Sequence, residues 1–292
     1  MTFPALPRRA FLRHASLLGL AALPVVRTAA GAETRLPLDV PTPYLPSTNV
    51  AVEEMLRVAN IGPDDVVVDL GSGDGRIVIA AAAAFGARGF GVDIDGKLVA
   101  EANENARKAG VADRVRFFER DVFATDVREA TVVTLYLLTS LVDRLQPKLF
   151  RELRPGTRIV AHDYGFTNWP ADRTVVISKT YHLYIVPAQA GGRWQLEASL
   201  PDGPRSYELD IRQERQSIRG GATSGGGFLP LFEPKLEGDR IRFVLVDGSR
   251  GHHFEGRVAG SLIEGTVKLG VGRDTLTRPF RATRIVTADP GQ

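Results

Sequence analysis

A run of acidic and glycine residues, Asp69-Leu70-Gly71-Ser72-Gly73-Asp74-Gly75-Arg76, has the composition of a loop that holds a nucleotide-containing cofactor. It follows three β-branched residues, Val66 to Val68, which are typical of a buried parallel strand. The three glycines allow a sharp turn and a close approach of a ligand to the backbone. The alanine-rich segment from Ile77 to Phe85 predicts a helix, whose first N–H groups would point at the ligand.

The position of the third glycine bears on the choice of cofactor. The dinucleotide-binding fingerprint G-x-G-x-x-G requires a glycine where this chain has Arg76, so NAD is the poorer fit. We expect Arg76 to pair either with Asp74 or with a carboxylate of the cofactor. A second predicted strand ends at Asp93, where a carboxylate can accept two hydrogen bonds from a ribose diol.

A further carboxylate, Asp121, follows the third predicted strand and could accept a hydrogen bond from the exocyclic amino group of adenine. Asp69, Asp74, Asp93 and Asp121 together would repel a pyrophosphate. They would attract a cofactor that carries an amino-acid ammonium group and a sulfonium centre. We therefore expect the cofactor to be S-adenosyl-L-methionine.

With these motifs the chain resembles the class I, seven-β-strand methyltransferases. The stretch from Pro43-Tyr44-Leu45-Pro46-Ser47-Thr48 to Trp169 resembles the branch that contains mitochondrial protein-lysine N-methyltransferases. The resemblance implies cofactor contacts at Gly71, Gly73, Asp93 and Asp121, and it implies that the segment from Tyr44 to Thr48 folds over the cofactor. The candidate cofactor-binding residues are Tyr44, Thr48, Asp69, Gly71, Ser72, Gly73, Asp74, Gly75, Asp93 and Asp121.

The resemblance implies a protein side-chain amine as the methyl acceptor, with a small molecule as the alternative. The segment from Ala161 to Phe166 differs from the sequence expected after the fifth strand of the lysine enzymes. No Asn-Pro-Pro-Tyr motif follows the fourth predicted strand, which disfavours methylation of adenine or of glutamine amides.

Candidate catalytic residues follow the predicted strands whose carboxyl ends meet at one edge of the sheet. They are Tyr136 after the fourth strand, and His162 and Asp163 after the fifth. Methyl transfer requires an aligned, deprotonated acceptor, and either His162 or Asp163 could take a proton from an amine. The alternative is that Tyr136 packs in the core and that His162 and Asp163 cap a loop. We expect no metal site, because adjacent residues such as His252 and His253 point to opposite faces of a strand.

The first 32 residues have the order of a twin-arginine signal peptide. Arg8-Arg9 precedes an apolar stretch too short to span a membrane in the mature protein, and a small-x-small site ends at Ala32. The alternative is an uncleaved N-terminal anchor. We expect cleavage, a periplasmic or secreted location and no stable membrane anchor afterwards.

Charge and cysteine content argue against a nucleic-acid-binding protein and against a protein that depends on cysteine chemistry. Four of the 37 basic residues lie in the predicted signal peptide, leaving 33 against 34 acidic residues, so no nucleic acid partner is expected. The chain contains no cysteine and therefore no disulfide and no thiolate nucleophile. Because S-adenosylmethionine is made in the cytoplasm, an exported chain could instead be a non-catalytic ligand-binding or scaffold protein on a methyltransferase-like fold.

The order of predicted elements indicates an α/β domain with a doubly wound, Rossmann-like seven-stranded sheet, followed by a smaller all-β domain. Glycine turns at 237–239, 247–249 and 259–261 predict an antiparallel meander or small barrel after a linker at 188–192. The predicted regions are a signal peptide at 1–32, an extended arm at 33–48, a methyltransferase domain at 49–187, a β domain at 193–286 and a tail at 287–292. The predicted elements are helices at 49–60, 76–85, 97–109 and 140–153, and strands at 65–70, 89–94, 114–118, 131–137, 157–161, 174–179 and 182–186.

Overall fold

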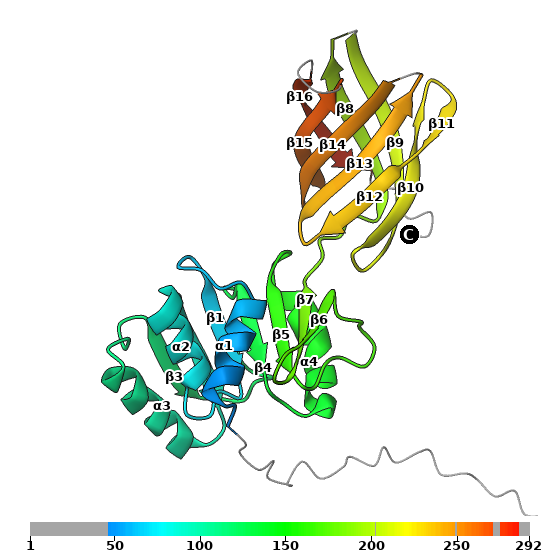
Figure 1. Cartoon of the computed structure of the whole chain (residues 1–292). Coiled ribbons are helices and arrows are strands. Elements are labelled where there is room, and N and C mark those ends of the chain that lie inside the picture. Colours follow the sequence, from blue (N-terminus) through cyan, green and yellow to red (C-terminus); the bar gives the residue numbers. More distant parts are fainter. Residues whose placement is uncertain (1–45, 202, 249, 271–274, 286–292) are drawn as a thin grey trace, which may run out of the picture. The chain divides into compact units, whose positions relative to one another are not determined.

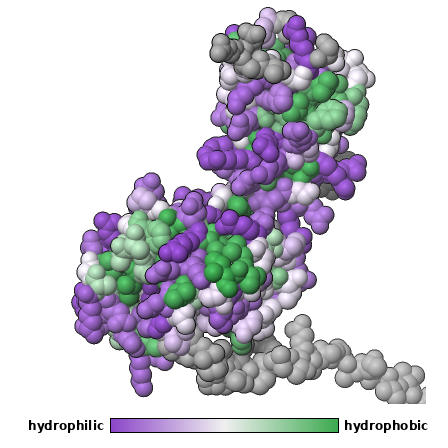
Figure 2. Space-filling view, viewed as in Figure 1, coloured by the Kyte–Doolittle hydropathy of each residue, from purple (hydrophilic) through white to green (hydrophobic). Residues whose placement is uncertain are grey.

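A computed structural model describes residues 46–285, apart from 202, 249 and 271–274. The predicted signal peptide, most of the predicted arm and Tyr44 lie outside the described residues. Two separate sheets are present, as the sequence predicts (Figure 1). Within the described part of the chain, no helix is both long enough and apolar enough to cross a membrane. The visible face of the molecule is largely hydrophilic with scattered apolar patches (Figure 2).

The first sheet has seven strands in the order β3-β2-β1-β4-β5-β7-β6. Strands β1 to β5 pair in parallel, while β7 runs antiparallel to both β5 and β6. The strand order reverses between β1 and β4, which is where α/β sheets bind ligands. The strands are β1 (Val66–Leu70), β2 (Arg88–Asp93), β3 (Val115–Glu119), β4 (Val132–Leu135), β5 (Arg158–His162), β6 (Arg173–Val176) and β7 (Thr180–Ile185).

Four helices cover the two faces of this sheet. Alternating strand residues divide the core: Val67 packs with α1 and α2, whereas Val68 packs with α4. Helix α3 packs with α2 and β3. The helices are α1 (Asn49–Val58), α2 (Arg76–Phe85), α3 (Gly96–Lys108) and α4 (Thr139–Glu152).

Four predicted boundaries are wrong by two or more residues, among them the start of β7, which lies at Thr180 rather than 182. Strand β4 ends at Leu135 rather than 137, because its neighbour β1 ends at Leu70, the residue that pairs with Leu135. Strand β6 ends at Val176 rather than 179, since a tight turn follows it. Helix α1 ends at Val58 rather than 60.

The second sheet is antiparallel, with nine strands in the order β11-β10-β9-β8-β16-β15-β14-β13-β12. Strand β10 contacts β12, and β11 contacts β13, so the two ends of the sheet approach each other in a nearly closed barrel. The three predicted glycine turns join β12 to β13, β13 to β14, and β14 to β15. The strands are β8 (Gly192–Leu200), β9 (Gly203–Glu214), β10 (Ser217–Ser224), β11 (Gly227–Pro230), β12 (Phe232–Glu237), β13 (Arg240–Asp247), β14 (Arg250–Ala259), β15 (Leu262–Leu269) and β16 (Leu276–Arg284).

The interior of the barrel is filled by its own side chains. Trp194, Tyr207, Phe243 and Phe254 are fully buried there. His252 is buried and its neighbour His253 is exposed, because they point to opposite faces of β14. The described residues contain no group of His, Asp and Glu that could hold a metal ion.

Candidate active site at the carboxyl edge of the first sheet

The glycine loop turns sharply between β1 and α2. Gly71, Gly73 and Gly75 all have positive φ, at 87°, 52° and 83°. The N–H groups of Gly71 and Ser72 both donate to the carbonyl of Val92 at 2.9 Å, which fixes the loop to the end of β2. Because a Cβ on Gly71 would lie 2.8 Å from Leu137 Cδ2, glycine leaves room there for the residues that follow β4.

Asp93 holds the other side of the loop. Its Oδ2 accepts a hydrogen bond from Gly73 N–H at 2.9 Å, and its Oδ1 accepts one from Asp95 N–H at 3.0 Å. A carboxylate has about four acceptor positions, so each oxygen retains the capacity for one further donor. The two hydrogen bonds fix the orientation of the Asp93 carboxylate. Its binding of a ribose diol stays a prediction.

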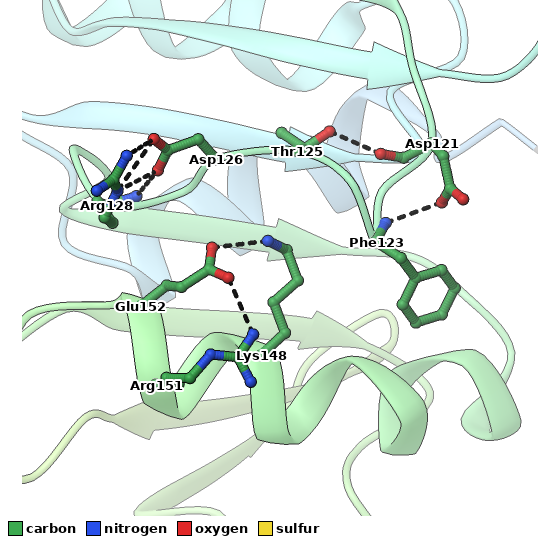
Figure 3. Close-up of polar contacts among 8 residues, drawn as sticks. All are labelled: Asp121, Phe123, Thr125, Asp126, Arg128, Lys148, Arg151 and Glu152. Carbon is green, nitrogen blue, oxygen red and sulfur yellow. Dashed lines mark hydrogen bonds and ion pairs between the residues drawn. The ribbon is translucent and has the colours of Figure 1, made fainter.

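Asp121 lies just beyond β3, beside the end of β2, because Glu119 of β3 pairs with Asp93. Its Oδ1 accepts from Phe123 N–H at 2.8 Å and its carbonyl accepts from the Thr125 hydroxyl at 2.8 Å, which makes a tight turn (Figure 3). The turn holds the exposed carboxylate of Asp121 at the same edge as Asp93.

Asp69 is buried at the end of β1. Its Oδ1 accepts from the Thr134 hydroxyl of β4 at 2.7 Å, but its Oδ2 has no hydrogen-bond partner among the described residues. Burial, together with the nearby charges of Asp93 and Asp74, raises the pKa of Asp69 to about 7, although the Thr134 hydrogen bond opposes the rise. An unpaired, buried carboxylate at the point where the strand order reverses fits a cationic ligand.

Arg76 links the loop to the segment before α1. Its guanidinium pairs with Asp74 at 2.5 Å, which is one of the two pairings that the sequence leaves open, and donates to the carbonyl of Ser47 at 2.5 Å. The next residue, Thr48, is the N-cap of α1 and accepts from Ala51 N–H at 3.2 Å. The predicted cofactor residue Thr48 therefore has a structural role, and Ser72 has a buried hydroxyl oxygen without a partner in the described chain.

The candidate catalytic residues meet at the ends of β4 and β5. The Tyr136 ring stacks on the His162 ring with centroids 4.1 Å apart, and the Tyr181 ring also stacks with His162, with centroids 5.4 Å apart. His162 is only 2% exposed, and its Nδ1 hydrogen-bonds to the Ser47 hydroxyl at 3.1 Å. Burial lowers the pKa of His162, so the imidazole is neutral near pH 7.

Asp163 follows β5 with a positive φ of 58°. Its Oδ1 accepts from Thr180 N–H at 3.2 Å and its Oδ2 lies 3.2 Å from the ammonium of Lys179. Partial burial raises the pKa of Asp163, but these hydrogen bonds outweigh it and hold the pKa below its usual value. Asp163 is therefore ionised and suited to binding a cation rather than to taking a proton.

A cavity of about 550 Å³ opens beside Asp163. Its walls include the aromatic rings of Tyr164, Phe166, Trp169 and His182 and the carboxylate of Asp163. The residues that the sequence interpretation missed are Ser47, Thr134, Tyr164, Lys179 and Tyr181. Ser47 lies in the Pro43 to Thr48 segment and Tyr164 in the Ala161 to Phe166 segment, but no local pattern marks the other three.

Comparison with known proteins finds similar methyltransferases. Residues 69–173 match the ANTKMT methyltransferase domain. A protein-lysine N-methyltransferase of Saccharolobus islandicus is 39% identical over 150 residues, which are 49% of this chain and 93% of that protein. The adenine nucleotide translocase lysine N-methyltransferase of Mus musculus is 33% identical over 46% of this chain, but only 58% of that protein is spanned.

A solved structure of an RNA methyltransferase from Salinibacter ruber, in complex with S-adenosyl-L-homocysteine, is 49% identical to this chain. The match covers 50% of this chain and 95% of that chain, with a TM-score of 0.49. The match to the Saccharolobus islandicus protein spans 93% of the length of that protein, so the two chains share a whole domain. The chain therefore belongs to the class I S-adenosylmethionine-dependent methyltransferases, and its residues 69–173 are similar to the ANTKMT methyltransferase domain.

Proposed function

We propose that this methyltransferase acts on a lysine side-chain amine of a protein. The observation that carries the proposal is the position of Asp163, an ionised carboxylate that already binds an ammonium group at the sheet edge where the glycine loop lies. Two of the relatives reported above, from Saccharolobus islandicus and Mus musculus, are named as lysine N-methyltransferases, which supports the same acceptor, whereas the Salinibacter ruber protein is named as an RNA methyltransferase.

S-adenosylmethionine supplies the methyl group as an electrophile. In our proposal Asp93 and Asp121 hold its adenosyl part, and Asp69 with the glycine loop holds its amino-acid end. Two observations support the fit of these residues to the cofactor. Oδ2 of Asp69 has no hydrogen-bond partner among the described residues, and a Cβ on Gly71 would collide with Leu137.

The acceptor amine must lose a proton before it attacks. The neutral His162 can take that proton at Nε2 if its Nδ1–H donates to the Ser47 hydroxyl. Nε2 is buried without a hydrogen-bond partner in the described chain and lies 3.7 Å from Asp163 Oδ2. Asp163 binds the incoming ammonium beside this base, and the ring of Tyr136 limits the access of water.

The apolar side chains around the site favour a macromolecular acceptor over a small molecule. Every large apolar side chain that the α/β domain exposes, among the described residues, lies at or near the carboxyl edge of the sheet. Ile94 and Phe118 flank Asp93 and Asp121, where they can cover an adenine ring. The others lie near Asp163 or at the start of α1 and α4, and a protein surface would bury them on binding. The full set is Val50, Ile94, Phe118, Leu138, Tyr164, Val176 and Ile177.

The experiment is methyl transfer from isotopically labelled S-adenosylmethionine to fractionated extracts of the source cells. We expect label on protein lysine, identified by mass spectrometry of digested bands, and no label with Asp93→Ala. Label confined to nucleic acid, lipid or small molecules would contradict a lysine acceptor, and the fraction that carries it would identify the true class.

We also propose that the enzyme works outside the cytoplasm, on the basis of Arg8-Arg9 and the apolar stretch that follows. Cell fractionation with the intact chain and with Arg8-Arg9→Lys-Lys tests this. Export of the intact chain and retention of the variant are the expected results, whereas cytoplasmic retention of both would contradict the proposal.

A further inference from the structure

The ammonium group at Asp163 belongs to the chain itself. Lys179 lies in the turn between β6 and β7, and its Nζ is 3.2 Å from Asp163 Oδ2. The same oxygen lies 3.7 Å from the buried Nε2 of His162. One carboxylate oxygen thus faces both a cation and a neutral imidazole nitrogen that has no hydrogen-bond partner in the described chain.

The backbone holds the Asp163 carboxylate in this direction. Asp163 adopts a left-handed conformation, which is uncommon for residues other than glycine. Its N–H donates to the Thr180 carbonyl at 2.7 Å, and its Oδ1 accepts from the Thr180 N–H at 3.2 Å. These bonds connect the end of β5 with the start of β7, and they leave Oδ2 directed at the ammonium.

Two phenols, Tyr136 and Tyr164, interact electrostatically with Lys179. The rings of Tyr136 and Tyr164 are stacked with centroids 6.5 Å apart, and Tyr136 in turn stacks on His162. The hydrogen bond and charge of Asp163, aided weakly by both tyrosines, raise the pKa of Lys179, so this side chain is an ammonium group at neutral pH. A carboxylate with adjacent aromatic rings is a set of groups that binds an ammonium ion.

We propose that Asp163, Tyr136 and Tyr164 form the subsite for the acceptor's ammonium group, and that Lys179 occupies this subsite until the acceptor displaces it. The inference rests on the proposed amine acceptor. Lys179 is about half exposed, at 47% of its side-chain surface, so its ion pair is weak and an incoming ammonium can replace it. Asp163 and Tyr164 also line the open cavity of about 550 Å³, so two of the three subsite residues border space that an acceptor can enter.

The test measures binding of Nα-acetyl-lysine amide, by nuclear magnetic resonance titration, to the full chain saturated with S-adenosylhomocysteine. Lys179→Met should bind this probe about threefold more tightly than the wild type, because the internal competitor is gone. Lys179→Arg retains the cation and should bind about as the wild type does. Asp163→Asn should bind about tenfold more weakly, and asparagine tolerates the left-handed backbone.

Lys268→Met is the matched control, because Lys268 forms a comparable exposed ion pair with Glu255 in the β barrel. It should leave probe affinity unchanged. Affinity for S-adenosylhomocysteine should stay constant across all variants and report correct folding. Equal or weaker probe binding by Lys179→Met, or no probe binding by any variant, would overturn the inference.

The outcomes also separate this inference from the proposed function. If the wild type methylates protein lysine but Lys179→Met leaves the probe affinity unchanged, the inference is wrong and the proposed function stands. If the variants bind the probe as expected but no protein lysine is ever methylated, the ammonium subsite stands and the lysine acceptor is wrong.

Discussion

Replacing Asp69 by Asn should weaken binding of S-adenosylhomocysteine and remove most of its pH dependence. In the ligand-free wild type the pKa of Asp69 is raised to about 7, so the carboxyl is largely protonated below that pH. An amino-acid ammonium group bound beside it favours the ionised form, and binding below pH 7 therefore releases a proton.

For the wild type, affinity should consequently rise with pH by up to about tenfold per unit below pH 7, and level off above it. Asp69→Asn should show a nearly flat profile and a loss of about 10- to 100-fold at pH 8, the value of a hydrogen bond to a charged group. Isothermal titration between about pH 5.5 and pH 8 measures both quantities. Identical slopes in the two proteins would show that Asp69 does not face the ligand's cation.

Asp69 should also affect the stability of the ligand-free protein. The pKa of Asp69 is raised in the folded state. The neutral carboxyl group therefore stabilises the folded protein fully below the unfolded-state pKa of about 4, and this stabilisation is lost as the pH rises through 7. Asp69→Asn should therefore melt at a higher temperature than the wild type at pH 8, with the difference shrinking toward acid pH. The buried charge is retained at a cost in stability, as expected of a ligand-binding group.

Replacing Gly75 by Ala should destabilise the α/β domain by about 2–5 kcal/mol. Gly75 has φ of 83°, where a Cβ is strained, and a Cβ there would lie 2.6 Å from Phe117 Cζ and 2.9 Å from Ala102 Cβ. The residue sits where the glycine loop enters α2, so the loop cannot shift without breaking its contact with α3 and β3. Calorimetric melting of the full chain measures the effect.

Gly110→Ala is the matched control for this substitution. Gly110 also has a positive φ, of 71°, but nothing lies within 4 Å of a Cβ placed on it. It should cost about 1–2 kcal/mol from backbone strain alone. An equal loss in the two variants would show that packing against Phe117 and Ala102 contributes nothing.

The parts of the fold that depend on local pattern could be predicted from the sequence. The valine run and the glycines specify strand, turn and helix within a few residues, and α2 begins and ends at the predicted residues. Alternating residues with glycine turns likewise indicate the antiparallel barrel. In both cases the information lies within about ten residues of chain.

The site could be predicted only in part, because its contacts join distant segments. The bond between Thr134 and Asp69 spans 65 residues, and the one between Ser47 and His162 spans 115. Strand order and register bring these pairs together, and neither is visible in a local pattern. Tyr136 shows the same limit: its apolar neighbours suggest a continuing strand, but the strand beside it has already ended at Leu70.

Asp163 shows the same limit. A carboxylate after the fifth strand suggests a base, but the sequence does not reveal that its positive φ and the turn after β6 place it beside Lys179. Its chemistry depends on a cation 16 residues later in the chain, which only the antiparallel pairing of β5 with β7 brings close.

The central claim is that the glycine loop and the carboxylates at the strand ends bind an adenosyl cofactor, and calorimetric titration of S-adenosylhomocysteine into the wild type and Asp93→Ala tests it most directly. Asp93 makes two backbone hydrogen bonds and keeps acceptor capacity for a diol, so its loss should lower affinity about 100-fold or more while the chain stays folded. Equal affinity in the two proteins, or no binding by the wild type, would contradict the claim.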